Sequence, residues 1–541
     1  MFIDKFKSED YPIVVGIDFG TTFSPKQPGK YSKTPTISLY NTSSPSTPRL
    51  EKWGWLAKVG GDNPKSKNNV TYRKFKLRLD ENYFQDPPPV QIDAIQAIAD
   101  YLEAFHQYIS GKILKGFGAG FSPDKFRFCL TVPAMWSDRA KGAMRQASIK
   151  ANIIQEHDHP DRLLLVTEPE AAALYCQLKS DQFNLRHQDR FMICDAGGGT
   201  VDLIVYEIEE TSAGKRLSEV TKGHGASCGS TFVDLNFEIL VKEKFKSQGV
   251  TLPEKVLGKI VEKFIDDIKP IFDGDSDHSM DLPSSNCFLS LQNGEAIGVE
   301  DGMFTISKVE LKTQIFDPVI DYILTLIQQQ LTSAKTCSAI FLVGGFGSSD
   351  YLLRRVRKAF GHVIYQINVP PRPDMAVVRG AVHAGLNPRV VTARVSRQWY
   401  GMTLFSEFRY GIDPIEKLFY HKNIAYCDDR IKRIVDKWEK VGVDEAKIFS
   451  IMFVKKTTNH ESFKIYGFKG DGPEPEHGND PRIVAVAEIV VPDTHLPSDP
   501  DGSEVEATFA MYFGLGETKI EVVTKGEVFT TVLTFDAEDI Y

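Results

Sequence analysis

Short apolar runs alternate with longer segments that carry an apolar residue every three or four positions, up to about Pro388. The short β-branched runs, of which Ile13 to Ile17 is the first, predict buried strands. The longer segments predict amphipathic helices that cover the strands. We expect helices over residues 92–110, 137–150, 232–245, 252–272, 307–331, 350–360 and 374–386, and further strands over 126–132, 163–167, 191–194, 201–208 and 338–343. This alternation predicts a large α/β unit with two lobes.

Two stretches depart from this pattern. Residues 23–48 are rich in Pro, Ser, Thr and Lys, which predicts a loop with little regular structure. After Pro388 helical periodicity thins out, and short alternating segments separated by Pro- and Gly-rich loops predict a β-rich region. We therefore divide the chain into an α/β unit over residues 1–388, a linker over 389–396 and a β-rich domain over 397–541.

The composition is that of a globular protein. Of the 541 residues, 42% are hydrophobic and 25% charged, which excludes wholesale disorder and collagen-like structure. The net charge of −8 gives no global attraction to nucleic acid or to anionic membranes. Seven scattered cysteines without a C-x-x-C pair are typical of reduced thiols in a cytoplasmic or nuclear protein. Because no apolar run is long enough to cross a bilayer, we expect a soluble protein that binds neither nucleic acid nor membranes.

A motif that suits phosphate binding occurs twice. One copy is Asp18-Phe19-Gly20-Thr21-Thr22, and the other is Asp195-Ala196-Gly197-Gly198-Gly199-Thr200; each follows a predicted strand. Glycines let backbone N–H groups approach phosphate oxygens, and an Asp at the strand end is placed to hold hydrated Mg²⁺ or to orient water. A single turn of this kind is most often an ordinary hairpin. Two copies favour a pair of turns that clamp one nucleoside triphosphate between two lobes.

A third glycine turn lies between a predicted buried strand and a helix. It comprises Gly344, Gly345, Phe346, Gly347 and Ser348. Such a turn suits close approach of a flat ring or ribose to the backbone at a helix N-terminus. The alternative is a plain strand-to-helix loop.

Together these motifs resemble the ATPase domain of the 70-kilodalton heat-shock chaperones, within the actin and sugar-kinase superfamily. The segments at residues 130–134, 167–173 and 342–349 resemble further motifs of that family and come in its order. The resemblance is greatest to the divergent branch that lacks a helical lid. It implies a duplicated actin-like (ribonuclease H-like) ATPase domain with two lobes, followed by a β-rich putative substrate-binding domain without a lid.

The resemblance also implies roles for individual residues. Asp18 and Asp195 hold hydrated Mg²⁺, Asp195 positions the hydrolytic water, and Glu168 binds a water of the metal shell. Thr200 contacts the γ-phosphate, and a catalytic lysine is expected at Lys76 or, as the alternative, at Lys74. Asp202 matches an acidic residue associated with a monovalent cation such as K⁺. The remaining ATP or ADP contacts that it implies are Gly20, Thr21, Thr22, Gly197, Gly198, Gly199, Gly229, Lys269, Gly344, Gly345, Gly347, Ser348 and Asp374.

The sequence departs from the family at the first phosphate loop. The chain after Thr22 contains Pro25 and Pro28 and cannot form the central hairpin strand that the family has there. We expect the Asp18 strand to lack this neighbour, which weakens support for its phosphate loop. Ser348 also replaces the family's arginine, which puts cation stacking on adenine in doubt, and the family's acidic-hydrophobic linker is unrecognisable.

Three functions fit these observations. The first is a Mg-dependent, chaperone-like ATPase that couples ATP binding and hydrolysis to the binding of polypeptide clients or co-chaperones. The second is a non-catalytic nucleotide-sensing or scaffold protein with a degenerate first phosphate loop. The third is a small-molecule kinase of the same superfamily, against which the β-rich region argues.

Overall fold

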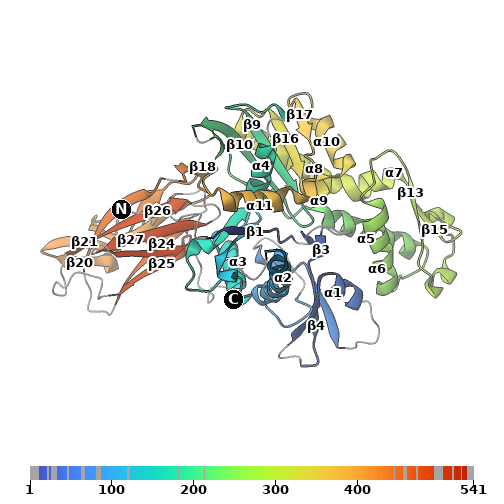
Figure 1. Ribbon diagram of the computed structural model, residues 1–541, viewed down its shortest axis with the longest axis horizontal. Helices are drawn as coiled ribbons and strands as arrows, with labels where there is room; N and C mark the ends of the chain where they lie inside the picture. Colours follow the sequence, from blue (N-terminus) through green and yellow to red (C-terminus); the bar gives the residue numbers. More distant parts are fainter. Residues whose placement is uncertain are drawn as a thin grey trace.

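The computed structural model describes residues 11–20, 23–25, 33–44, 48–61, 68–80, 87–117, 122–179, 183–212, 214–443, 445–454, 460–468, 470, 473–492, 504–513, 517–524 and 527–532. Two mixed α/β lobes lie one above the other in Figure 1, and a β-rich domain extends from their left side. None of the helices in these described ranges is both long and apolar enough to cross a membrane.

The first lobe is built on a three-stranded parallel sheet in the order β1 (Ile13–Ile17), β7 (Phe126–Val132) and β8 (Leu163–Thr167). Helices α2 (Ala94–Phe117) and α3 (Asp138–Lys150) pack against it, and the Ser137 hydroxyl caps α3 by accepting from the Ala140 N–H. All three strands and the α3 cap confirm the sequence prediction. A small outer sheet of this lobe contains β5 (Arg49–Trp53), β4 (Ile37–Asn41) and β6 (Asn69–Arg73), beside α1 (Gly54–Gly61) and the 3-10 turn η2 (Phe75–Leu79).

The second lobe carries the larger sheet, whose central strands are β9 and β10 (Figure 1). Its order is β17 (Gln366–Asn368), β16 (Ala339–Val343), β9 (Arg190–Ala196), β10 (Val201–Thr211), β11 (Gly214–Glu219), β18 (Val391–Val395) and β22 (Lys440–Gly442), with β12 (His224–Ala226) also paired to β10. The helices of this lobe are α5 (Ser230–Ser247), α6 (Glu254–Lys263), α7 (Lys308–Glu310), α8 (Asp317–Ala334), α9 (Gly344–Gly347) and α10 (Asp350–Phe360). A small antiparallel sheet of β13 (His278–Asp281), β15 (Met303–Ile306) and β14 (Val299–Glu300) completes it.

Two of the predicted long helices change type along their length. The segment after α6 becomes a π-helix over Phe264–Ile268, and α7 continues through a π-helix over Leu311–Phe316 into α8. The predicted capping box between Ser307 and Glu310 is present at the start of α7. Apolar periodicity therefore located these helices, but it did not distinguish i→i+4 from i→i+5 hydrogen bonding.

The two lobes meet along helices α4 (Glu168–Leu178) and α11 (Ala376–Leu386), which follow equivalent strands of the two sheets. Their backbones approach so closely that a Cβ built on Gly380 of α11 lies 1.6 Å from the carbonyl oxygen of Ala171 in α4. Only glycine fits at this contact. This close backbone contact adds to the buried side chains of the two helices, which share one hydrophobic cluster.

The expectation of a loop over residues 23–48 is wrong. This stretch contains β2 (Phe23–Pro25) and β3 (Lys33–Pro35), which pair antiparallel, as well as β4. Pro25 and Pro35 stand at the ends of this two-stranded ladder, where a missing N–H is tolerated, so their presence did not exclude strands. The ladder is separate from the sheet of the first lobe.

The predicted lack of a neighbour for the Asp18 strand agrees with the described part of the first lobe. Among the described strands, β1 pairs only with β7, whereas its counterpart β9 pairs with both β16 and β10. Within the described part of the first lobe, β1 thus lies at the edge of its sheet, and the matching strand of the second lobe is central.

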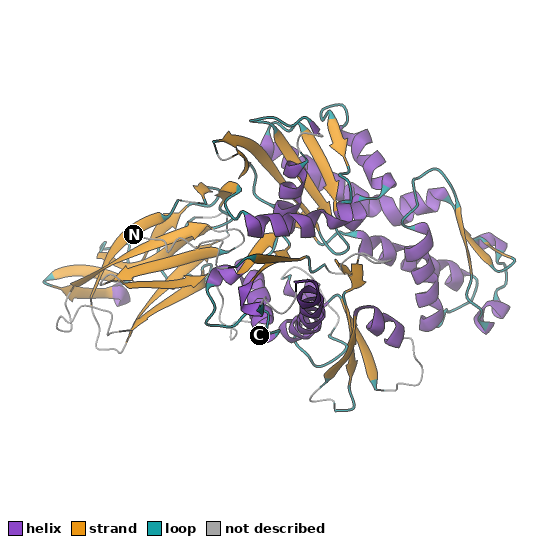
Figure 2. Ribbon diagram, viewed as in Figure 1, coloured by secondary structure: helices purple, strands orange, loops and turns teal. Residues whose placement is uncertain are grey.

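The β-rich domain consists of two antiparallel sheets packed face to face, with almost no helix between them (Figure 2). One sheet has the order β20 (Leu418–His421), β21 (Ile424–Val435), β19 (Trp399–Glu407), β24 (His460–Phe468) and β25 (Val484–Pro492). The other has the order β23 (Lys447–Val454), β26 (Glu504–Phe513), β27 (Thr518–Thr524) and β28 (Glu527–Val532).

The segment expected to be a linker, residues 389–396, contains strand β18, which joins the sheet of the second lobe beside β11. On this strand Arg394 is buried and pairs with Glu170, at 2.6 and 2.8 Å, and with Glu219 at 3.5 Å. The Glu517 carboxylate of the β-rich domain binds Arg145 of α3 through two hydrogen bonds of 2.7 and 2.5 Å. The domain is therefore attached to both lobes by buried ion pairs.

Candidate functional site

A cavity of about 470 Å³ opens between the two lobes, and most of the residues expected to bind nucleotide line it. From the first lobe come Asp18 and Gly20 after β1, Lys74 and Lys76 around η2, and Glu168 at the start of α4. From the second lobe come the glycine turn after β9, the turn after β16 and two residues of the helical region. The expected residues that line it are Asp18, Gly20, Lys74, Lys76, Glu168, Asp195, Gly197, Gly198, Gly199, Thr200, Lys269, Gly344, Gly345 and Asp374.

The remaining expected residues lie elsewhere. Thr21 and Thr22 fall outside the described residues. Gly229 and Gly347 do not line the cavity, and the Ser348 hydroxyl turns back to donate to the Gly345 carbonyl at 2.7 Å. Asp202 is buried one strand away, opposite Asp195 in the β9–β10 ladder.

Lys76 is a deeply buried residue of the cavity lining. It is 1% exposed, and its Nζ lies 2.5 Å from the Glu168 Oε1. The aromatic rings of Phe19 and Trp136 lie near the ammonium group, with centroids 5.7 and 5.4 Å away. Lys74, in contrast, has a left-handed backbone, with φ of 58°. The structure therefore assigns the buried, paired position to Lys76, while both lysines line the cavity.

Carboxylates concentrate beside Lys76. Asp18, Glu168 and Asp195 line the same part of the cavity, and burial raises the pKa of Asp18 to about 6, with Glu168 as the second cause. Burial, with Glu168 and Asp18 next, also raises the pKa of Asp195 well above its ordinary value. Burial raises the pKa of Asp202 to about 7, again with Glu168 as the second cause. These carboxylates destabilise one another and favour the presence of a cation.

This donor set fits Mg²⁺. Hard oxygen ligands from carboxylates are what Mg²⁺ prefers, and it keeps several waters when few protein ligands contact it. The Asp202 Oδ2 is buried without a hydrogen-bond partner among the described residues, whereas Oδ1 accepts from the Met135 N–H at 3.0 Å. That unsatisfied oxygen is consistent with a second, monovalent cation near Asp202.

The second phosphate turn is held from behind by helix α5. The N–H groups of Gly229, Ser230 and Thr231 donate to the carbonyls of Gly199, Gly197 and Gly198 at 3.0, 3.0 and 2.8 Å. A Cβ on Gly229 would lie 2.5 Å from the Gly198 oxygen. Gly229, which was expected to contact nucleotide, does not line the cavity and instead supports the turn through its backbone.

The third glycine turn approaches the Asp195 carboxylate directly. Gly344 has φ of +83°, and a Cβ there would lie 2.4 Å from the Asp195 Oδ1 and 2.5 Å from the Ala196 oxygen. Any side chain at this position would displace Asp195. Strands β9 and β16 pair in parallel with Asp195 opposite Val343, so the two turns start side by side.

Lys269 extends the cavity toward the helices of the second lobe. Its Nζ donates to the Asp234 carboxylate at 2.7 Å and to the Ser230 carbonyl at 3.0 Å. Burial lowers the pKa of this lysine, and the Asp234 charge opposes that shift.

Sequence reasoning missed Lys33, which lines the cavity from β3. Its positive charge lowers the pKa of both Asp18 and Asp195. Nothing in the local pattern marked it, because the stretch that contains it was interpreted as a loop. The pairing of β3 with β2 is what brings it to the carboxylates.

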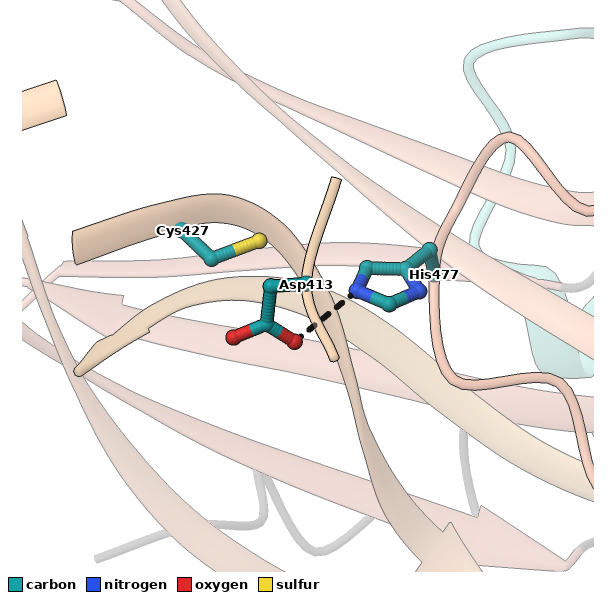
Figure 3. A group of neighbouring side chains, drawn as sticks. All are labelled: Asp413, Cys427 and His477. Carbon is teal, nitrogen blue, oxygen red and sulfur yellow. Dashed lines mark hydrogen bonds and ion pairs between the residues drawn. The ribbon is translucent and has the colours of Figure 1, made fainter. Parts of the chain in front are cut away.

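A second group of side chains that resembles a metal site lies in the β-rich domain. Ligand atoms of Asp413, Cys427 and His477 lie within 4.8 Å of one another, and Figure 3 shows the His477 ring directed at the carboxylate. The same carboxylate also accepts from Arg409 and from Arg430. Two guanidinium groups disfavour a cation at this carboxylate. We interpret the group as an ion-pair hub that fixes the loop carrying His477.

Comparison with known proteins shows which family the sequence is similar to. The model of the family described as Hsp70 protein matches residues 125–392, from the start of β7 into β18. Heat shock 70 kDa protein 12A of Homo sapiens and that of Mus musculus are each 24% identical to the chain over 549 residues, covering 81% of it and 79% of the relative.

Heat shock 70 kDa protein 12B of Homo sapiens is also 24% identical, over 543 residues, and the match covers 80% of the chain and 77% of that relative. These matches and the two-lobed α/β architecture confirm the predicted fold class, a duplicated actin-like ATPase domain followed by a β-rich domain. The chain is therefore similar to Hsp70 proteins over most of its length, and the Hsp70 model matches residues 125–392 of its two-lobed body.

Proposed function

We propose that the chain binds Mg-ATP in the cavity between its two lobes and hydrolyses it. The observation that carries this proposal is convergence: both Asp-glycine turns, the Lys76–Glu168 pair and the third glycine turn line one cavity of about 470 Å³. These elements are up to several hundred residues apart in the chain. A set of unrelated loops would not bring glycine turns, carboxylates and a buried lysine to one place.

The charge balance of the cavity supports a metal-nucleotide complex over a free nucleotide. Eight acidic and six basic side chains line it, so its formal charge is negative. A free nucleoside triphosphate is itself strongly anionic and would be repelled. Bound Mg²⁺ supplies positive charge that offsets the negative charge of the cavity and that of the triphosphate. Asp18, Asp195 and Glu168 are placed to hold it directly or through water.

The chain's own groups then have distinct tasks. The Asp195 carboxylate orients the attacking water, and Thr200 binds the terminal phosphate beside it. The Lys76 ammonium neutralises charge that develops on the phosphate oxygens, while Glu168 holds it in position. Lys269 and Gly344 line the part of the cavity that holds the nucleoside, and Asp374 lies beside the ribose. No covalent intermediate is required.

The direct test is titration calorimetry with Mg-ATP, followed by single-turnover hydrolysis. The unmodified chain is expected to bind and to release phosphate, and Asp195→Asn is expected to bind but to lose hydrolysis by about 10²-fold or more. Equal hydrolysis rates for the two proteins would contradict the ATPase. Absence of binding would contradict the nucleotide site altogether.

The alternative is a nucleotide sensor without turnover, and the edge position of β1 favours it. A phosphate loop that follows an edge strand has less backbone support than its counterpart after β9. This alternative predicts Mg-ATP binding in calorimetry together with hydrolysis no faster than that of Asp195→Asn.

We propose further that the β-rich domain binds polypeptide and that ATP changes its affinity. Supporting this, β18 carries buried Arg394 into the sheet of the second lobe, so the two parts share a structural element. The test is binding of a fluorescent, apolar peptide with and without Mg-ATP. Affinity that is identical in the two conditions would contradict the coupling.

A further inference from the structure

A second cavity, of about 410 Å³, lies where the two lobes meet the β-rich domain. The first lobe contributes Trp136, Lys141 and Thr167, and the second contributes Glu219 and Lys222. Met135, Ser137 and Asp138 of the first lobe also line it, and the β-rich domain and β18 contribute the others, among them Arg397, Tyr400, Trp438 and Phe513. The indole of Trp136 lies between this cavity and Lys76, since its ring contacts the Lys76 ammonium.

The walls of this second cavity carry excess positive charge. Five basic and three acidic side chains line it, a formal charge of +2. The acidic groups are already engaged. Asp138 accepts from Tyr400 at 2.9 Å and from Gln398 at 3.0 Å, Glu517 is bound by Arg145, and Glu219 accepts from the Val395 N–H at 2.9 Å.

Lys141 is the most buried of the three lysines that line the cavity. It is 8% exposed, and the single carboxylate oxygen within 4 Å among the described residues is the Asp138 Oδ1, 3.6 Å from its Nζ. Burial lowers the pKa of this lysine, with the Asp138 charge opposing the shift, so the ammonium form is desolvated without full compensation. Helix α3 also begins at this cavity, and its N-terminus adds positive potential.

Two further donors on the wall lack partners. The Trp136 Nε1 and the Thr167 hydroxyl are buried and have no hydrogen-bond partner among the described residues, and both residues line the cavity. Both atoms are shielded from solvent, so they lie behind the cavity surface and a ligand in the cavity does not contact them directly.

The aromatic wall indicates the shape of a bound anion. Trp136, Tyr400, Trp438 and Phe513 line the cavity, and the ammonium groups of Lys222 and Lys437 lie 4.1 and 4.8 Å from the Trp438 ring centroid. A cavity that combines cations with aromatic faces favours a ligand with an anionic head and a flat, apolar body.

We propose that this second cavity binds a small organic dianion with a flat apolar body, of the aryl phosphate or aromatic dicarboxylate class. The anionic head lies at Lys141 and the N-terminus of α3, and the apolar body lies toward Trp438. Because the walls come from both lobes and the β-rich domain, the ligand bridges all three. The site does not depend on nucleotide binding in the first cavity.

The test is calorimetric titration of the full chain with phenyl phosphate, alongside phenol and inorganic phosphate. Phenyl phosphate is expected to bind at least about tenfold more tightly than either comparator. Phenol lacks the anionic head, and inorganic phosphate lacks the flat apolar body. Phenol that binds as tightly as phenyl phosphate would overturn the anion site. Inorganic phosphate that binds as tightly would overturn the aromatic half.

Variants then locate the binding. Lys141→Gln is expected to weaken phenyl phosphate binding about tenfold or more, and Lys141→Arg to retain most of it. Lys150→Gln, on the same helix but outside the cavity, is the matched control and should leave binding unchanged. If Lys141→Gln fails to fold, exposed Lys222→Gln serves in its place. Binding that survives Lys141→Gln or Lys222→Gln but is lost in Lys269→Gln belongs to the first cavity and overturns the proposal.

Discussion

The ammonium nitrogen of Lys76 lies 2.5 Å from a carboxylate oxygen of Glu168, although 92 positions separate the two residues in the chain. The pair joins η2 of the first lobe to the start of α4, where the lobes meet. A change at Lys76 therefore alters the charge balance of the cavity and is expected to alter its function. The first prediction follows from this pair.

Replacing Lys76 with Gln removes the cation that faces Glu168 and the neighbouring carboxylates. We expect hydrolysis to fall by about 10²-fold, because a preorganised charge at the phosphates is lost. Lys74→Gln is the matched control, since Lys74 lines the same cavity, and it should change the rate by less than about threefold. Single-turnover rates for both variants provide the measurement. A larger loss in Lys74→Gln would assign the catalytic role to Lys74.

Gly380→Ala is predicted to be strongly destabilising. The added Cβ would lie 1.6 Å from the Ala171 carbonyl oxygen, so α4 and α11 must move apart, at a cost of roughly 3 kcal/mol or more. Gly258→Ala, in α6, has no atom within 4 Å of the new methyl group and should stabilise by up to about 1 kcal/mol. Urea unfolding of the two variants measures the difference. Equal midpoints would contradict the close packing of the lobes.

Stabilisation by Mg²⁺ is predicted to increase with pH. Asp18 and Asp202 have pKa values raised to about 6 and about 7. A carboxyl group with a raised pKa holds its proton more tightly in the folded state, so without a cation the folding stability falls as pH rises from about 4 to about 7. Once the carboxyl groups are ionised, bound Mg²⁺ offsets the repulsion between them.

The measurement is the midpoint of thermal unfolding with MgCl₂ against NaCl of equal ionic strength. The increase caused by MgCl₂ should be larger at about pH 8 than at about pH 5.5. An increase that is the same at both values would show that these carboxyl groups do not titrate against the metal.

Asp413→Asn is predicted to destabilise the β-rich domain. Asp413 is 7% exposed and accepts hydrogen bonds from Arg409, Arg430 and His477, which hold its pKa well below the usual value despite burial. Without the Asp413 charge, the guanidinium groups of Arg409 and Arg430 lose their carboxylate partner. The free energy of unfolding should fall by roughly 3 kcal/mol. Asp480→Asn, which breaks an exposed pair with Arg482, should change stability little.

Unfolding of these two variants is best followed by fluorescence of Trp399 and Trp438, the tryptophans of the β-rich domain. The transition in Asp413→Asn should shift to lower urea concentration, and that in Asp480→Asn should not. Addition of Zn²⁺ should leave the midpoint of the unmodified chain unchanged; a clear increase would contradict the ion-pair interpretation of Asp413, Cys427 and His477.

Much of the core could be predicted because its signals are local. Ile13–Ile17 and Phe126–Val132 appear with the expected bounds, since a run of β-branched and apolar residues leaves a buried strand as the main outcome. The capping box at Ser307 likewise depends on residues three positions apart. The glycine turns were recognisable because glycine is required there, as the Gly344 contact with Asp195 shows.

The remaining features depend on long-range contacts that no local pattern encodes. Lys33 lines the cavity from β3, which pairs with β2. The prolines in this stretch led to the prediction of a loop where these two strands lie. The choice between Lys74 and Lys76 depended on which of them is buried against Glu168. Ser348 was expected at the adenosine side but donates to its own turn instead. Helix–strand alternation could not reveal these, because each requires two distant segments to meet.

Strand β18 has a consequence for how the molecule comes apart. Its backbone is hydrogen-bonded to β11 on one side and to β22, from the β-rich part of the chain, on the other. Pulling the β-rich domain away therefore requires rupture of a ladder inside the sheet of the second lobe, not the bending of a tether. Amide protons of Val391 to Val395 should exchange with solvent only when that rupture occurs. Their exchange rate therefore reports how often the β-rich domain separates from the second lobe.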